Sequence, residues 1–100
     1  MTTGAQRGIL VGAARRVVAA ARAERAVMPQ DDVEREFYLG VEAAAEGVIH
    51  PELEMTRSPS WVERQTPEFR EGYVRMTTML ATARCAAAPP FQLRLPDPKD

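Results

Sequence analysis

A chain of 100 residues with a formal net charge of −1 is long enough for one domain with a modest core, and its 45% hydrophobic and 27% charged residues exclude disorder throughout. Its one cysteine, Cys85, excludes an intrachain disulfide, and no apolar run approaches the roughly 20 residues that cross a bilayer. We therefore expect a single-domain protein of the cytoplasm with no membrane partner. The many alanines, and arginine in place of nearly all lysine, indicate a GC-rich, bacterial genome.

The first predicted element is an arginine-rich helix over residues 5–28, a segment of strong helix formers without proline. Pro29 is expected to end it, because proline clashes with the preceding turn of a helix. The apolar seam of this helix is thin and rich in alanine, and it consists of Leu10, Ala14, Val17, Ala21 and Met28.

An acidic amphipathic helix is predicted over residues 31–50, with Asp31 or Asp32 as its N-cap and Pro51 just beyond its end. Asp31 with Glu34 fits a capping-box-like pattern. Gly40 and Gly47 interrupt its interior, and we expect one of them to mark close packing with a neighbouring helix. Its apolar stripe has spacings of three and four: Val33, Phe37, Val41, Ala44, Ala45 and Val48.

Residues 51–66 form a connector in which Ser58 and Pro59 can start a short helix around Trp61. Thr66 as cap and Pro67 at the first position then predict the main core helix, residues 67–88. Its stripe is the best in the chain and consists of Phe69, Tyr73, Met76, Leu80, Ala83 and Ala87.

The tail, residues 89–100, alternates apolar Phe91, Leu93 and Leu95 with polar residues. That pattern is typical of a short one-sided strand or of an extended peptide that docks in a groove. The chain as a whole is predicted to be all-α: a single helical domain, residues 1–100, with three main helices, a short helix near Trp61 and an extended C-terminal tail. Such helices pack as a bundle or as half of an intertwined dimer. We find no internal repeat of useful period.

Charge is unevenly distributed along the chain. Residues 31–54 are acidic and contain a single arginine, Arg35. Residues 1–30 contain a single acid, Glu24, and five arginines: Arg7, Arg15, Arg16, Arg22 and Arg25. These arginines can pair with the acidic segment of the same chain or of a second chain, or with an acidic partner. They can also lie along a nucleic-acid backbone, although the segment has no aromatic for base stacking and the pI is only about 5.9.

Candidates for chemistry are few. Glu42, Glu46 and His50 are spaced by four and so project from one side of the second helix, which makes them a weak metal candidate, but no further ligand motif accompanies them. Cys85 lies among alanines and is expected to be inert. We expect no cofactor, no metal and no catalytic residue.

The predicted function is a non-catalytic helical protein–protein interaction module: a homo-oligomer, a small accessory subunit or a regulator. Its partner contacts are expected at Trp61, Phe91, Leu93 and Leu95, although Trp61 can instead serve as the lid of the core. The alternative is a small nucleic-acid-binding protein that uses the arginines of the first helix. A third interpretation is a minor enzyme or metal protein centred on Glu42, Glu46 and His50.

Overall fold

The computed structural model describes residues 4–57, 59–86, 95, 96 and 98, which form five helices and no strand. The helices are α1 (Gly4–Ala26), α2 (Glu34–Ile49), α3 (Pro51–Thr56), α4 (Pro59–Glu63) and α5 (Pro67–Ala86). The all-α prediction is confirmed, as are the three main helices and the short helix around Trp61. The connector holds one further short helix, α3, that we did not predict.

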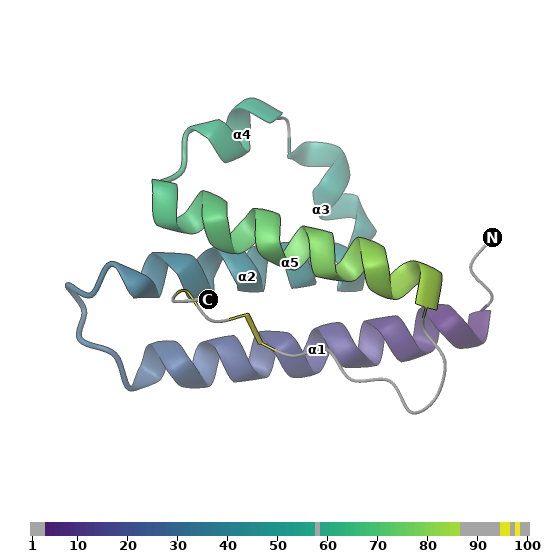
Figure 1. Cartoon of the computed structure of the whole chain (residues 1–100). Coiled ribbons are helices and arrows are strands. Elements are labelled where there is room, and N and C mark those ends of the chain that lie inside the picture. Colours follow the sequence, from purple (N-terminus) through teal and green to yellow (C-terminus); the bar gives the residue numbers. More distant parts are fainter. Residues whose placement is uncertain (1–3, 58, 87–94, 97, 99–100) are drawn as a thin grey trace.

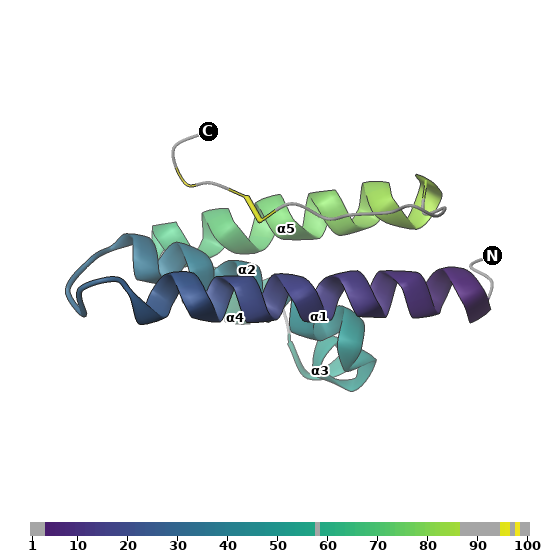
Figure 2. The ribbon, with the colours of Figure 1, turned by 90° about the horizontal axis from the view of Figure 1, so that it is seen from below.

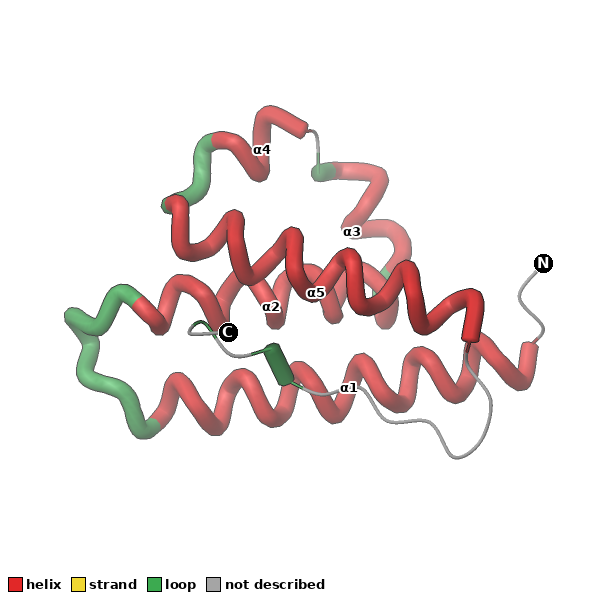
Figure 3. The backbone as a smooth tube through the Cα atoms, in the orientation of Figure 1, coloured by secondary structure: helices red, strands yellow, loops and turns green. Residues whose placement is uncertain are grey.

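The central helix is α2, which packs against both α1 and α5, whereas α1 and α5 hardly touch each other. The α1–α2 hairpin is antiparallel, and the arm formed by α3 and α4 then carries the chain back so that α5 runs parallel to α2 (Figures 1 and 3). Figure 2 places α3 on the opposite side of the hairpin from α5. Among the described residues, every helix is too short or too polar to cross a bilayer.

Helix ends follow the local signals with one correction. The Thr66 hydroxyl accepts a hydrogen bond from the Phe69 amide at 3.2 Å, so the predicted cap of α5 is confirmed. At the start of α2 the acceptor is Asp32, whose Oδ1 lies 2.9 Å from the amide nitrogen of Glu34. Of the two predicted caps, Asp32 therefore accepts the first amide of the helix, whereas the capping box of Asp31 with Glu34 is wrong because α2 begins at Glu34 itself.

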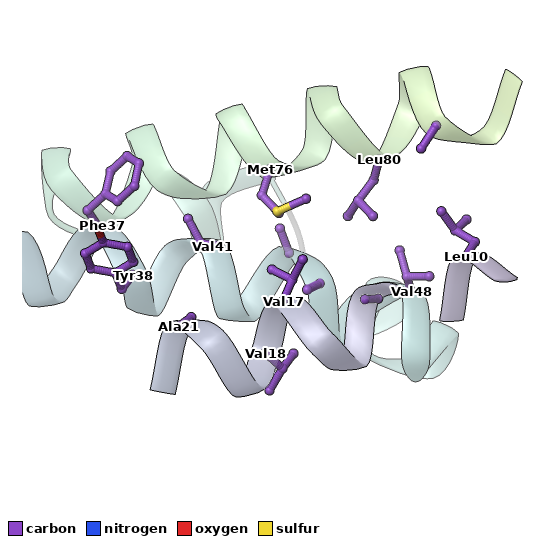
Figure 4. Packing of buried hydrophobic residues seen from close by; sticks show 14 residues of the cluster. Leu10, Val17, Val18, Ala21, Phe37, Tyr38, Val41, Val48, Met76 and Leu80 are labelled. Carbon is purple, nitrogen blue, oxygen red and sulfur yellow. The ribbon is translucent and has the colours of Figure 1, made fainter. Parts of the chain in front are cut away.

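The core lies where the three long helices meet, and Met76 from α5, Val17 from α1 and Val41 from α2 are fully buried there (Figure 4). Nearly all predicted seam and stripe residues in the described part of the chain are buried or packed against this cluster. Val33 is the exception, with 62% of its surface exposed, because it precedes α2 instead of lying on its inner face.

The close packing expected at Gly40 or Gly47 occurs at Gly40. A Cβ on Gly40 would overlap the Phe69 carbonyl oxygen, and a Cβ on Gly72 would overlap the carbonyl oxygen of Phe37. The parallel helices α2 and α5 therefore cross backbone to backbone at two glycines that face each other's preceding turn.

Leu95 is half-buried and packs against the core cluster, while Phe91 and Leu93 of the predicted extended segment lie outside the described residues. Leu95→Ala is expected to lower the free energy of unfolding by about 1 kcal/mol, since part of a leucine's burial is lost. Urea unfolding at constant m-value measures the change. An unchanged midpoint would mean that Leu95 does not pack on the core in solution.

Candidate functional site

Two arginines of α1 converge on one buried carboxylate of α2. Arg22 Nε lies 2.7 Å from Glu42 Oε1, and Arg25 Nη2 lies 2.5 Å from Glu42 Oε2. Only 6% of Glu42 is exposed, and its hydrogen bond with Arg22, together with its charge, raises the pKa of that guanidinium. Arg22 also reaches Glu46 at 3.3 Å. The intrachain pairing of the basic and acidic segments is therefore confirmed for these arginines.

The remaining arginines of α1, Arg7, Arg15 and Arg16, are exposed and form no ion pair with any residue that the structure describes. Arg15 and Arg16 project about 100° apart around the helix axis, because an α-helix has 3.6 residues per turn. The five arginines thus do not form one continuous basic stripe. Their use along a nucleic-acid backbone stays a prediction.

The three residues of the predicted metal candidate, Glu42, Glu46 and His50, each form an ion pair or lie close to an opposite charge. Glu42 and Glu46 face arginines, and the Nδ1 of exposed His50 lies 3.5 Å from Glu52 Oε1. Within the described part of the chain, no group of three His, Cys, Asp or Glu side chains is placed to hold a metal ion.

Trp61 is half-buried and covers part of the core. Its ring makes edge contacts with Phe69 and Tyr73 at centroid distances of 5.7 and 6.1 Å. The guanidinium of Arg57 lies 5.0 Å from the Trp61 centroid, and its Nη1 donates to the carbonyl of Ala43 at 2.7 Å. The α3–α4 arm is thereby tied to α2 and α5. A partner contact at Trp61 or Leu95 stays a prediction, and the side chain of Cys85 lies outside the described residues.

A shallow groove of about 460 Å³ runs between α1 and the end of α2, and we call it the basic groove. Buried Val18 and half-buried Ile49 form its apolar floor, and the exposed side chains of Arg15 and Arg22 form its rim. The complete lining is Arg15, Val18, Ala19, Arg22, Glu46, Ile49 and His50.

A second groove of about 370 Å³, the tip groove, adjoins the basic groove and shares Arg22 with it. Arg25 and Arg35 line it together with Ala26, Met28 and Gln30. Arg35 Nη1 donates to the carbonyls of Arg25 and Met28, at 2.7 and 3.1 Å, and so closes the end of α1. The buried Nε of Arg25 has no hydrogen-bond partner among the described residues.

The two grooves together form one arginine-lined face of the α1–α2 hairpin. Its arginines are Arg15, Arg22, Arg25 and Arg35. Glu42 and Glu46 form ion pairs with two of them, Arg22 and Arg25. A positive rim over an apolar floor suits an acidic segment that carries aliphatic side chains. We did not predict Arg35 or Ile49 as site residues, although Arg35 is the one basic residue in an acidic segment.

In comparisons with known proteins, no protein-family model, curated protein or solved structure matches the chain. Its function has to be inferred from its own residues.

Proposed function

We propose that this chain is a non-catalytic helical interaction module that binds an acidic protein segment on the arginine-lined face of its α1–α2 hairpin. The observation that carries the proposal is the basic groove, where an apolar floor at Val18 and Ile49 lies beneath arginines that include the exposed Arg15. An apolar floor of this kind contributes affinity for side chains, and the charged rim contributes orientation and speed of association.

A protein segment fits this face better than a nucleic-acid backbone does. Glu46 lines the basic groove, and Glu42 forms ion pairs with Arg22 and Arg25. These carboxylates already neutralise part of the charge of Arg22 and Arg25, and the apolar floor offers a phosphate backbone no favourable contact. An acidic peptide with a valine- or leucine-like side chain uses both parts of the groove.

Selection of random displayed peptides on the immobilised chain tests the proposal directly. We expect enrichment of peptides in which aspartate or glutamate flanks an aliphatic residue. Arg15→Glu should weaken their binding at least tenfold, which corresponds to about 1.4 kcal/mol. The matched control is Arg70→Glu, which makes the same charge change at an exposed position on α5.

Two outcomes would contradict the proposal. One is the absence of an acidic consensus, or a consensus whose binding survives Arg15→Glu. The other is tight binding of a short DNA duplex with a steep salt dependence that Arg15→Glu removes, which would support the nucleic-acid alternative instead.

A further inference from the structure

The connector between α1 and α2, residues 27–33, carries an exposed apolar surface with acidic neighbours, and we call it the hairpin tip. Val27 and Val33 are 80% and 62% exposed. Elsewhere among the described residues, the exposed large hydrophobic residue is Val74, at 57%. Exposed Asp31 lies between the two valines in sequence, and Glu34 follows them. Two exposed valines in one short helix connector are unusual, because polar turn residues are the norm there.

The hairpin tip has the chemistry that the basic groove would accept. The groove offers apolar contact at Val18 and Ile49 and positive charge at Arg15, while the tip offers valines and carboxylates. Within one chain the two cannot meet. The continuous helix α1 holds Val18 roughly 12 Å along its axis from Ala26, the residue before Val27, at 1.5 Å per residue.

We propose that the occupant of the basic groove is the hairpin tip of a second copy of this chain, an inference that rests on the proposed function. Because tip and groove lie on the same hairpin, two hairpins placed antiparallel about a two-fold axis bring each tip to the other's groove. Both contacts then form at once and the assembly closes as a dimer. The same pairing sets Arg15 of each copy beside Asp31 of its partner, so that the segregated charges attract between chains.

The test is the molar mass in solution, measured by light scattering and sedimentation equilibrium at low and moderate salt. At about 0.1 mM protein, the intact chain should have twice its mass of 11.1 kDa and should dissociate more readily as salt is raised. Arg15→Glu and Asp31→Arg should each weaken the dimer at least tenfold. The double variant carrying both changes should recover it, because the pair is restored with its signs exchanged.

Mixing the Arg15→Glu and Asp31→Arg variants gives a further check of the same interface. Each is expected to be monomeric alone, while the mixture forms a heterodimer, since one groove–tip contact keeps Arg15 with Asp31 and the other joins the two exchanged charges. Circular dichroism and urea unfolding verify that every variant keeps its fold, and Arg70→Glu is the control for net charge.

A monomer at this concentration, or a dimer indifferent to both single variants, would overturn the inference. The peptide selection then separates the two proposals. Acidic peptides that bind a monomeric chain through Arg15 leave the proposed function standing with a different partner. Failure of both experiments removes both proposals.

Discussion

Replacing Gly72 with alanine is expected to lower the free energy of unfolding by about 3 kcal/mol, the upper end of the usual cost of overpacking. The new Cβ would overlap the Phe37 carbonyl oxygen and lie 2.9 Å from its carbonyl carbon. Since these atoms belong to the backbone of α2, no rotamer change can make room, and α2 and α5 must move apart. At this chain length the melting temperature should fall by roughly 15 °C, which differential scanning calorimetry measures directly.

The matched control is Gly12→Ala, the same substitution on α1. There the added Cβ has no closer neighbour than Arg16 Nη1 at 3.8 Å, the end of a flexible side chain. Alanine is the better helix former, so Gly12→Ala should stabilise the chain by about 0.5–1 kcal/mol. Opposite signs for one chemical change isolate the helix crossing as the cause. Equal effects would show that α2 and α5 do not approach at this distance.

Gly40→Ala should resemble Gly72→Ala, because its Cβ would overlap the Phe69 carbonyl oxygen. The double variant is expected to lose less stability than the sum of the two single losses. A single separation of α2 from α5 relieves both overlaps, and neighbouring sites that share one relaxation are not additive.

Sequence patterns predicted the elements well because helix signals are local. The cap at Thr66, the prolines at 51 and 67, and the apolar stripes each act within a few residues along the chain, and the observed helices begin and end beside them. The crossing is not local, but it leaves a trace in the sequence. Residues 36–40 read Glu-Phe-Tyr-Leu-Gly and residues 68–72 read Glu-Phe-Arg-Glu-Gly, a short repeat that we did not detect.

The arginine-lined face could not be predicted in the same way. Periodicity gives the direction of a helix's apolar side, but not its rotation and register against a neighbour. The contact of Arg22 with Glu42 joins residues 20 positions apart, and only the packed hairpin decides that Glu42 takes Arg22 and Arg25 while Arg15 is left exposed. The general attraction between the two segments was predictable from charge, whereas the division of the arginines between fold and surface was not.

That division leads to the second large effect, at Glu42. Its carboxylate is buried and accepts hydrogen bonds from both Arg22 and Arg25, whose own side chain is only 22% exposed. Glu42→Gln preserves the shape but removes the counter-charge of a mostly buried guanidinium. Breaking a buried pair costs about 3–5 kcal/mol, and partial access of Arg25 to water reduces the expected loss to about 2 kcal/mol. Urea unfolding measures it, and the loss should persist at high salt because buried pairs are poorly screened.

Glu46→Gln is the matched control, since the Glu46 side chain is 30% exposed and meets Arg22 at the longer distance of 3.3 Å. Its expected cost is about 0.3 kcal/mol, the usual contribution of an exposed ion pair. A double-mutant cycle of Glu42→Gln with Arg25→Met should give a coupling energy of about 1.5 kcal/mol. If both glutamine variants were equally mild, the arginines paired with Glu42 would be as available to ligands as Arg15. A large loss confined to Glu42 assigns Arg25 to the fold and leaves Arg15 as the charge that meets a partner.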